Sequence, residues 1–155
     1  MNVTRDWVRQ QAAKATAPVV EGWRDGALTV WVPGRPANPM NGSRGHWSKH
    51  ARWAKDWRER AGTHLLPFLG RFSYGRTLWL PETPKAITLT IYAPGRGFDD
   101  DAWGPICKPL RDALKDMRII DDDGNNPDGT PRHAITYAQV TKAPVVGIAV
   151  RIARK

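Results

Sequence analysis

Apolar residues alternate with polar residues along several stretches of the chain. In residues 85–93, KAITLTIYA, the residues Ile87, Leu89 and Ile91 fall on one side and threonines fall on the other. Successive side chains of a strand point to opposite faces, so this pattern predicts a strand with one buried face. Three more stretches rich in β-branched and aromatic residues are predicted as strands, at 27–32, 133–142 and 145–152.

A different period marks the helices. Trp53, Trp57, Ala61 and Leu65 repeat every four residues within 46–66, while most of the Lys and Arg residues lie off that stripe. This spacing predicts an amphipathic basic helix in which Trp53 and Trp57 belong to the core rather than to a binding surface. Two further helices are predicted at 2–16 and at 105–117, with Pro105 in the first turn of the latter.

The resulting order is helix, strand, helix, strand, helix, strand, strand. It predicts an α/β or α+β class with a mixed sheet flanked by helices. A chain of 155 residues forms one core, so we expect a single domain over 1–155, with 1–26 as a peripheral helical extension. We expect no membrane span and a cytoplasmic protein, because long apolar runs are absent and Cys107 is the single cysteine.

Charge is distributed unevenly along the chain. The formal net charge is +9, which favours a polyanionic partner such as nucleic acid. Residues 99–123 nevertheless hold eight Asp against four Lys or Arg. Carboxylates repel a phosphate backbone unless cations lie between them, so the pattern favours a divalent metal at a phosphate-processing site. The alternative is that these Asp-rich segments are solvated turns.

The acidic residues suggest a ligand set. On an extended segment Asp99 and Asp101 point to one side, and the second cluster, Asp121 to Asp123, follows the helix that starts near the first. Oxygen ligands favour Mg²⁺ or Mn²⁺. Lys108 is expected near the start of the helix, where it is a candidate to neutralise a phosphate oxygen, although an exposed lysine often has no such role.

Other site classes fit poorly. Neither Gly124 nor Gly129 stands at the sixth position of an EF-hand loop with an acidic first residue. The four histidines lack metalloprotease spacing, and no GxxxxGK[ST] run is present, so we expect no nucleotide cofactor. The histidines are expected to be loop or helix-face residues.

The segment from Arg35 to Arg60 combines cations with tryptophans, a composition that suits branched or partly open DNA. Six residues are the candidate DNA contacts: Arg44, His46, Trp47, Lys49, Arg52 and Lys55.

These residues resemble a known family. Residues 98–123, FDDDAWGPICKPLRDALKDMRIIDDD, resemble the signature of RusA-type Holliday junction resolvases: D-x-D-N, a Lys, D-A-L or D-G-L, and an Asp pair after an apolar patch. The upstream segment 38–61 is also similar, with Asn41, His46 and Trp47 the residues that align. The resemblance covers roughly Pro33 to Val140. Ala102 replaces the usual Asn, and the spacing to Lys108 resembles phage and actinobacterial members.

The resemblance implies a homodimeric, Mg²⁺-dependent endonuclease that makes paired symmetric nicks in four-way DNA junctions during recombination and repair. It implies Asp99, Asp101 and Asp123 as metal ligands and Lys108 as the group facing the scissile phosphate. The insertion after Asp123 leaves Asp122 open as a ligand, although counting from Asp112 favours Asp123. It also implies a bacterial or phage-infected host cell.

Two other functions remain open from the sequence. One is a DNA-binding protein without catalysis, in which the Asp clusters are structural. The other is a metal-dependent nuclease that acts on flaps or other branched DNA.

Overall fold

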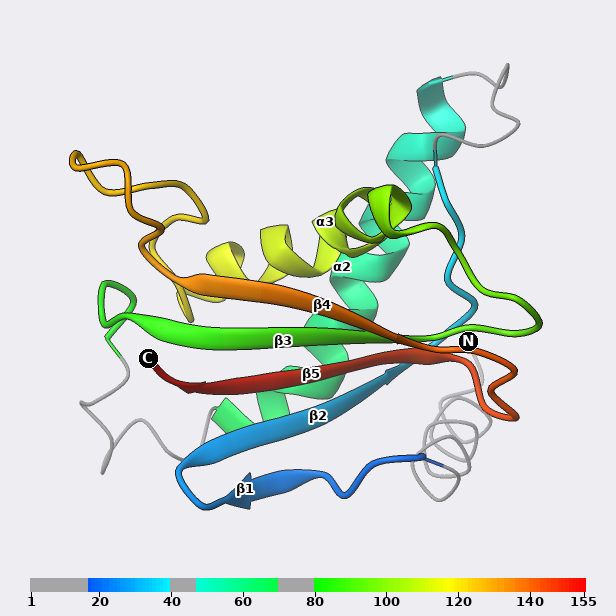
Figure 1. Ribbon diagram of the computed structural model, residues 1–155, viewed down its shortest axis with the longest axis horizontal. Helices are drawn as coiled ribbons and strands as arrows, with labels where there is room; N and C mark the ends of the chain where they lie inside the picture. Colours follow the sequence, from blue (N-terminus) through cyan, green and yellow to red (C-terminus); the bar gives the residue numbers. More distant parts are fainter. Residues whose placement is uncertain (1–16, 40–46, 70–79) are drawn as a thin grey trace.

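Five strands form one mixed sheet in the order β1-β2-β5-β3-β4 (Figure 1). The computed structural model describes residues 17–39, 47–69 and 80–155. The strands are β1 (Gly22–Arg24), β2 (Ala27–Pro33), β3 (Lys85–Tyr92), β4 (Ala134–Val140) and β5 (Gly147–Arg154). Neighbours pair antiparallel except β3 and β4, which are parallel. The mixed sheet expected from the sequence is therefore confirmed.

Two helices cover one face of this sheet. α2 (Trp47–Leu69) contacts β2, and α3 (Asp100–Asp116) links β3 to β4 in a β-α-β unit and contacts β4 (Figure 1). A parallel pair needs such a crossover, because its two strands run in the same direction. Within the described residues, neither helix is long and apolar enough to cross a membrane.

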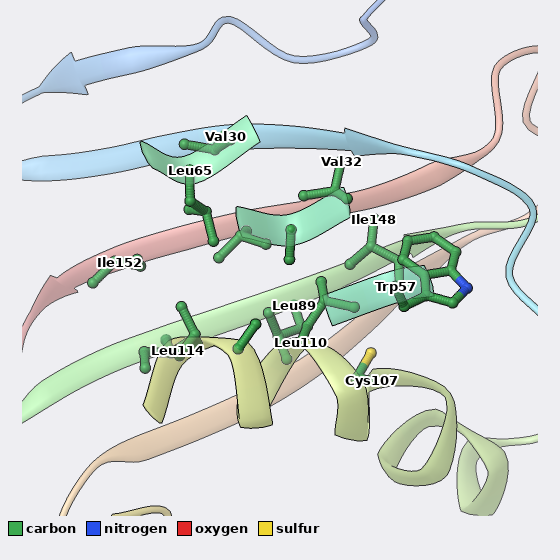
Figure 2. Close-up of a cluster of buried hydrophobic side chains, with 14 of the residues drawn as sticks. Val30, Val32, Trp57, Leu65, Leu89, Cys107, Leu110, Leu114, Ile148 and Ile152 are labelled. Atoms are coloured by element: carbon green, nitrogen blue, oxygen red, sulfur yellow. The ribbon is translucent and has the colours of Figure 1, made fainter. Parts of the chain in front are cut away.

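The core lies between the helices and the sheet. β3 buries alternate residues, including Ile87, Leu89 and Ile91, as its pattern predicted. Trp57 and Leu65 of α2 pack against it together with residues of α3 (Figure 2). Burying one such side chain stabilises the fold by about 1.5–3 kcal/mol, so this layer holds α3 firmly against the sheet.

α3 differs from its expected extent. It begins at Asp100 rather than Pro105 and contains both Pro105 and Pro109. A proline inside a helix removes one hydrogen bond and displaces the carbonyl four residues earlier, which bends the helix. Figure 1 shows this bend after the first turns. Burial of Ile106, Leu110 and Leu114 keeps the helix continuous despite the prolines.

Smaller differences occur elsewhere. α2 continues past Gly62 and Pro67, since Ala61 and Leu65 are held in the core. The expected helix at 2–16 lies outside the described residues, and residues 17–26 of the expected helical extension carry the edge strand β1 instead.

Candidate functional site

Three consecutive carboxylates, Asp99 to Asp101, stand where the chain enters α3; we call them the acidic turn. Asp99 is the N-cap with φ −65° and ψ 152°, and Asp100 and Asp101 belong to the first helical turn. The expectation that Asp99 and Asp101 lie on an extended segment and share one side by strand alternation is therefore wrong. The helix starts earlier than the prolines indicated, so only Asp99 is extended.

No lysine, arginine or histidine of the described residues forms an ion pair with the acidic turn. All three residues are exposed, and within the described ranges their side chains take part in no hydrogen bond or ion pair. An N-cap aspartate ordinarily accepts a hydrogen bond from a backbone N–H of the first turn, but Asp99 makes no such bond. Its carboxylate oxygens are therefore available to a ligand.

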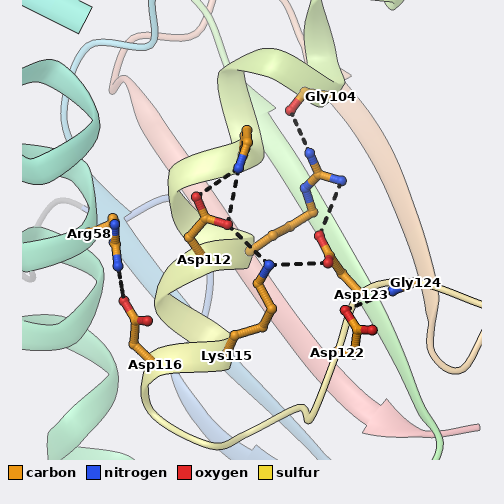
Figure 3. Close-up of polar contacts among 10 residues, drawn as sticks. Arg58, Gly104, Asp112, Lys115, Asp116, Asp122, Asp123 and Gly124 are labelled. Carbon is orange, nitrogen blue, oxygen red and sulfur yellow. Dashed lines mark hydrogen bonds and ion pairs between the residues drawn. The ribbon is translucent and has the colours of Figure 1, made fainter. Parts of the chain in front are cut away.

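A second group of charges runs along the exposed side of α3; we call it the charge row. It consists of Lys108, Arg111, Asp112 and Lys115 of α3, with Asp123 from the following loop (Figure 3). Lys108 lies in the third turn of α3, so the expectation that it stands near the start of the helix is wrong.

The charge row is internally paired. Asp112 lies 3.0 Å from Lys108 Nζ and 3.3 Å from Lys115 Nζ. Lys115 Nζ also donates to Asp123 Oδ1 at 3.2 Å, and Arg111 Nη1 lies 3.8 Å from Asp123 Oδ2. Lys108 is the most exposed member, with 62% of its side chain accessible, so it is the one best placed to meet a ligand in solution.

These pairs shift the pKa values of the carboxyl groups. Burial works against ionisation of Asp112, but the hydrogen bonds and charges of Lys108 and Lys115 outweigh it and lower the pKa of Asp112. Asp123 has a lowered pKa for the same reason, with Lys115 outweighing burial. The hydrogen bond to Asp123 raises the pKa of Lys115. Both acids are therefore ionised and already neutralised by lysines.

The expected metal ligands are not all brought together. Among the described residues no group of three or more His, Cys, Asp or Glu side chains could hold a metal ion. Asp123 is engaged by Lys115 and Arg111, and Asp122 accepts a hydrogen bond from Gly124 N at 3.3 Å within its own turn. Of the expected ligands, the carboxylates of the acidic turn form no ion pair with the described residues, and the set of Asp99, Asp101 and Asp123 does not form one site.

The first residue of the second Asp cluster has a structural role. Asp121 accepts a hydrogen bond from Nε2 of the buried His133 at 2.8 Å, and His133 Nδ1 accepts one from Lys85 N at 3.2 Å. Arg132 Nη1 lies 2.6 Å from the other oxygen of Asp121. His133 is a loop residue, as expected, but it is buried and connects β3 to the loop that carries Asp121. Chain spacing gave no signal for this contact.

The cations of α2 divide into two groups. Arg58 pairs with Asp116 of α3, Arg60 with Asp56, and Lys55 with Glu59 at 3.8 Å. Lys49 and Arg52 are exposed and have no acidic partner within the described part of the chain. They lie in the first turns of α2, which project beyond the sheet (Figure 1). Two of the six candidate DNA contacts are therefore unneutralised cations on an accessible surface.

The other residues singled out in the sequence add no further cation to this surface within the described residues. Arg44 and His46 lie outside the described residues, and Trp47 is the first residue of α2. Trp57 is buried and Trp53 packs partly against the core, which confirms their expected role. Burial raises the pKa of the Cys107 thiol to about 12 despite the nearby Arg111, so this thiol is not a nucleophile at neutral pH.

No model of a protein family and no curated protein matches this chain.

Proposed function

We propose that this protein is a Mg²⁺-dependent endodeoxyribonuclease that resolves four-way DNA junctions by paired symmetric cleavage. The observation that carries the proposal is the acidic turn: three exposed carboxylates that form no ion pair with the described residues, in a protein of net charge +9. In such a chain, with several cations on the neighbouring faces of α2 and α3, carboxylates left without partners favour a cation ligand.

Asp99 and Asp101 are the residues that would hold the ion. Bound there, Mg²⁺ supplies activation of water and stabilisation of charge on a phosphodiester. Asp123 would join this set only by giving up its ion pairs with Lys115 and Arg111, which lie at 3.2 and 3.8 Å. While these ion pairs are intact, Lys115 and Arg111 neutralise Asp123.

Lys108 is proposed to face the scissile phosphate. It stands on the same side of α3 as Asp112 and Lys115, at i, i+4 and i+7, and is the most exposed of these cations. Its ammonium group would neutralise charge that develops on the phosphate during cleavage. Lys49 and Arg52 would bind phosphates of the DNA backbone at some distance from the phosphodiester that is cut.

The test is cleavage of a labelled synthetic four-way junction and a matched linear duplex, each with Mg²⁺ and with EDTA. We expect paired nicks in the junction only, dependent on Mg²⁺. The variant Asp101→Asn is expected to lose more than about a hundredfold in rate, the scale of removing one group that stabilises transition-state charge. Asp25→Asn, in the β1–β2 turn, is the matched control and should cut at the wild-type rate.

Three outcomes would contradict the proposal in different ways. Wild-type cleavage by Asp101→Asn would remove the acidic turn from the site. Equally tight junction binding in EDTA and in Mg²⁺, without cutting in any divalent metal, would indicate a DNA-binding protein without catalysis. Cleavage of flaps in preference to junctions would keep the site and change the substrate.

A further inference from the structure

One edge of the sheet is a strand without the usual protection against pairing. β4 is the outermost strand in Figure 1, and within the described residues it pairs only with β3. Its seven residues, AITYAQV, include no charge and no proline, and its register with β3 is continuous, without a bulge. Proteins usually protect an edge with charges, proline, a bulge or a short strand. β1, at the other edge, has three residues and ends in Arg24, so β4 is the edge able to accept another strand.

The ladder shows which backbone groups of β4 face outward. Val140 O accepts a hydrogen bond from Ala93 N at 2.9 Å, so the backbone of Val140 points toward β3. This direction alternates from one residue of a strand to the next. Ile135, Tyr137 and Gln139 therefore point their N–H and C=O groups away from β3, where no described strand pairs with them.

The side chains of these three residues leave the edge clear. Ile135 and Tyr137 pack against the core. Gln139 uses its amide on Phe98: Oε1 accepts a hydrogen bond from Phe98 N at 2.7 Å, and Nε2 donates to Phe98 O at 3.1 Å. The outward backbone groups are therefore left to water or to a further strand.

The outward groups are complementary to a second copy of themselves. If a second β4 lies antiparallel, with Tyr137 opposite Tyr137 of that copy, Ile135 lies opposite its Gln139. Residues of such hydrogen-bonded pairs exchange both of their bonds, so every outward N–H and C=O gains a partner. An axis centred on Ile135 or Gln139 would leave some of these groups unpaired.

The charges beside β4 favour the same arrangement. A net charge of +9 repels a second copy, and this repulsion is least at an uncharged surface such as β4. Residues 121–133, before β4, hold four Asp against one Arg, whereas residues 141–146, after it, hold one Lys and no acid. An antiparallel copy brings each of these segments toward the oppositely charged segment of its neighbour.

We infer that the protein forms a homodimer by antiparallel pairing of two β4 strands about a two-fold axis at Tyr137. The two five-stranded sheets then become one continuous sheet, with the helices of both copies on the same face. This pairing gives the dimer of the proposed function a defined contact surface. Its evidence is the sheet edge alone, which does not depend on nuclease activity.

Two double variants test the register. In the proposed dimer Thr136 lies opposite Ala138 of the second copy, in a non-hydrogen-bonded pair, where side chains are closest. Thr136→Lys with Ala138→Lys places like charges opposite each other, so we expect the dimer dissociation constant in sedimentation equilibrium to rise at least about tenfold. Thr136→Lys with Ala138→Glu places opposite charges together and should restore dimerisation.

The matched control is Thr88→Lys with Thr90→Lys, which adds the same charge to the same face of the sheet but on the inner strand β3. It should dimerise as the wild type does. Hydrogen exchange of the wild type needs no variant to fold: the amides of Ile135, Tyr137 and Gln139 should exchange slowly in the dimer and faster on dilution.

Three results would overturn the inference. A wild type that is monomeric at high micromolar concentration, with these amides unprotected, would leave the edge to a strand of a different protein. A double-lysine β4 variant that dimerises like the wild type would place the contact elsewhere, and loss of the dimer in the β3 control would place it on the open face of the sheet.

The proposed function and this pairing fail separately. A dimer that shows the expected response to the charges on β4 but cuts no junction would remove the proposed function and keep the pairing. Paired cleavage by a dimer that is insensitive to those charges would keep the function and remove the pairing.

Discussion

Identical side chains have different roles in this protein because of their neighbours. Asp112 and Asp123 face lysines along the charge row, whereas Asp99 and Asp101 face solvent at the start of α3. Paired carboxylates contribute to the stability of the folded state, while unpaired ones are available to bind. This contrast, more than the number of acids, separates the structural aspartates from the candidate ligands.

The pairing of Asp112 predicts a stability that depends on pH. Its pKa is lowered from 3.8, so its stabilising contribution is present above 3.8 and is lost as the pH falls through the folded value. At pH 7 we expect Asp112→Asn to lower the free energy of unfolding by about 1 kcal/mol, because both lysines lose their partner. The variant should therefore unfold at a lower urea concentration than the wild type.

Urea unfolding followed by tryptophan fluorescence checks this prediction at several pH values. The curves of wild type and Asp112→Asn should converge in strong acid, where Asp112 is protonated in both states. A difference that stays constant from neutral pH into strong acid would show that the ion pairs are not its origin. Asp25→Asn, which is exposed in a turn, serves as the control.

At the scale of elements, the two helices differ in how they use their charges. α3 pairs the charges of its exposed face with one another and with Asp123, and the carboxylates at its start have no ion-pair partner among the described residues. α2 pairs its middle cations and leaves Lys49 and Arg52 unneutralised near its start, within the described part of the chain. Contact between α2 and α3, including the Arg58–Asp116 pair, holds the two helices in a fixed relation.

Charge reversal in α2 should therefore reduce binding to DNA. In the double variant Lys49→Glu and Arg52→Glu, we expect weaker junction binding and a salt dependence whose logarithmic slope falls by about 2, because two phosphates are no longer neutralised. Fluorescence anisotropy of a labelled junction in EDTA, at several salt concentrations, measures both quantities.

The matched control reverses two exposed arginines at the end of the sheet, Arg24→Glu and Arg154→Glu, for the same change in net charge. If the two double variants reduce affinity and slope equally, only net charge matters and α2 is not the binding surface.

At the scale of the whole molecule, the acidic turn and the Asp121–His133 pair lie at opposite ends of β4. The acidic turn is tied to the carboxyl end of β4 through Gln139, and His133 directly precedes the first residue of β4. The length of β4 therefore lies between the structural pair and the candidate site. β4 is also an edge of the sheet, paired with β3 alone among the described strands.

A four-way junction is nearly two-fold symmetric, so paired cleavage requires two sites related by a similar axis. We expect a homodimer, with a mass twice the 17.4 kDa of the chain in sedimentation equilibrium. A monomer at high micromolar concentration, with or without junction DNA, would contradict paired cleavage by one bound enzyme.

The sequence by itself determined the elements that a local period marks. The alternation in 85–93 predicted β3, and the four-residue stripe of Trp53, Trp57, Ala61 and Leu65 predicted α2 with its buried side. Burial follows period directly, because side chains on one face of a strand or helix share one environment. The acidic segment was also identified from the sequence, since it is contiguous.

Only the tertiary structure decided which charges meet. Lys115 lies eight residues from Asp123, Gln139 lies 41 residues from Phe98, and His133 lies 48 from Lys85. No local period records such pairs, because they depend on how α3 bends and where the loops return. The start of α3 was misplaced for a related reason: the burial of Ile106 and Leu110 in the core outweighs the local preference of Pro105 and Pro109.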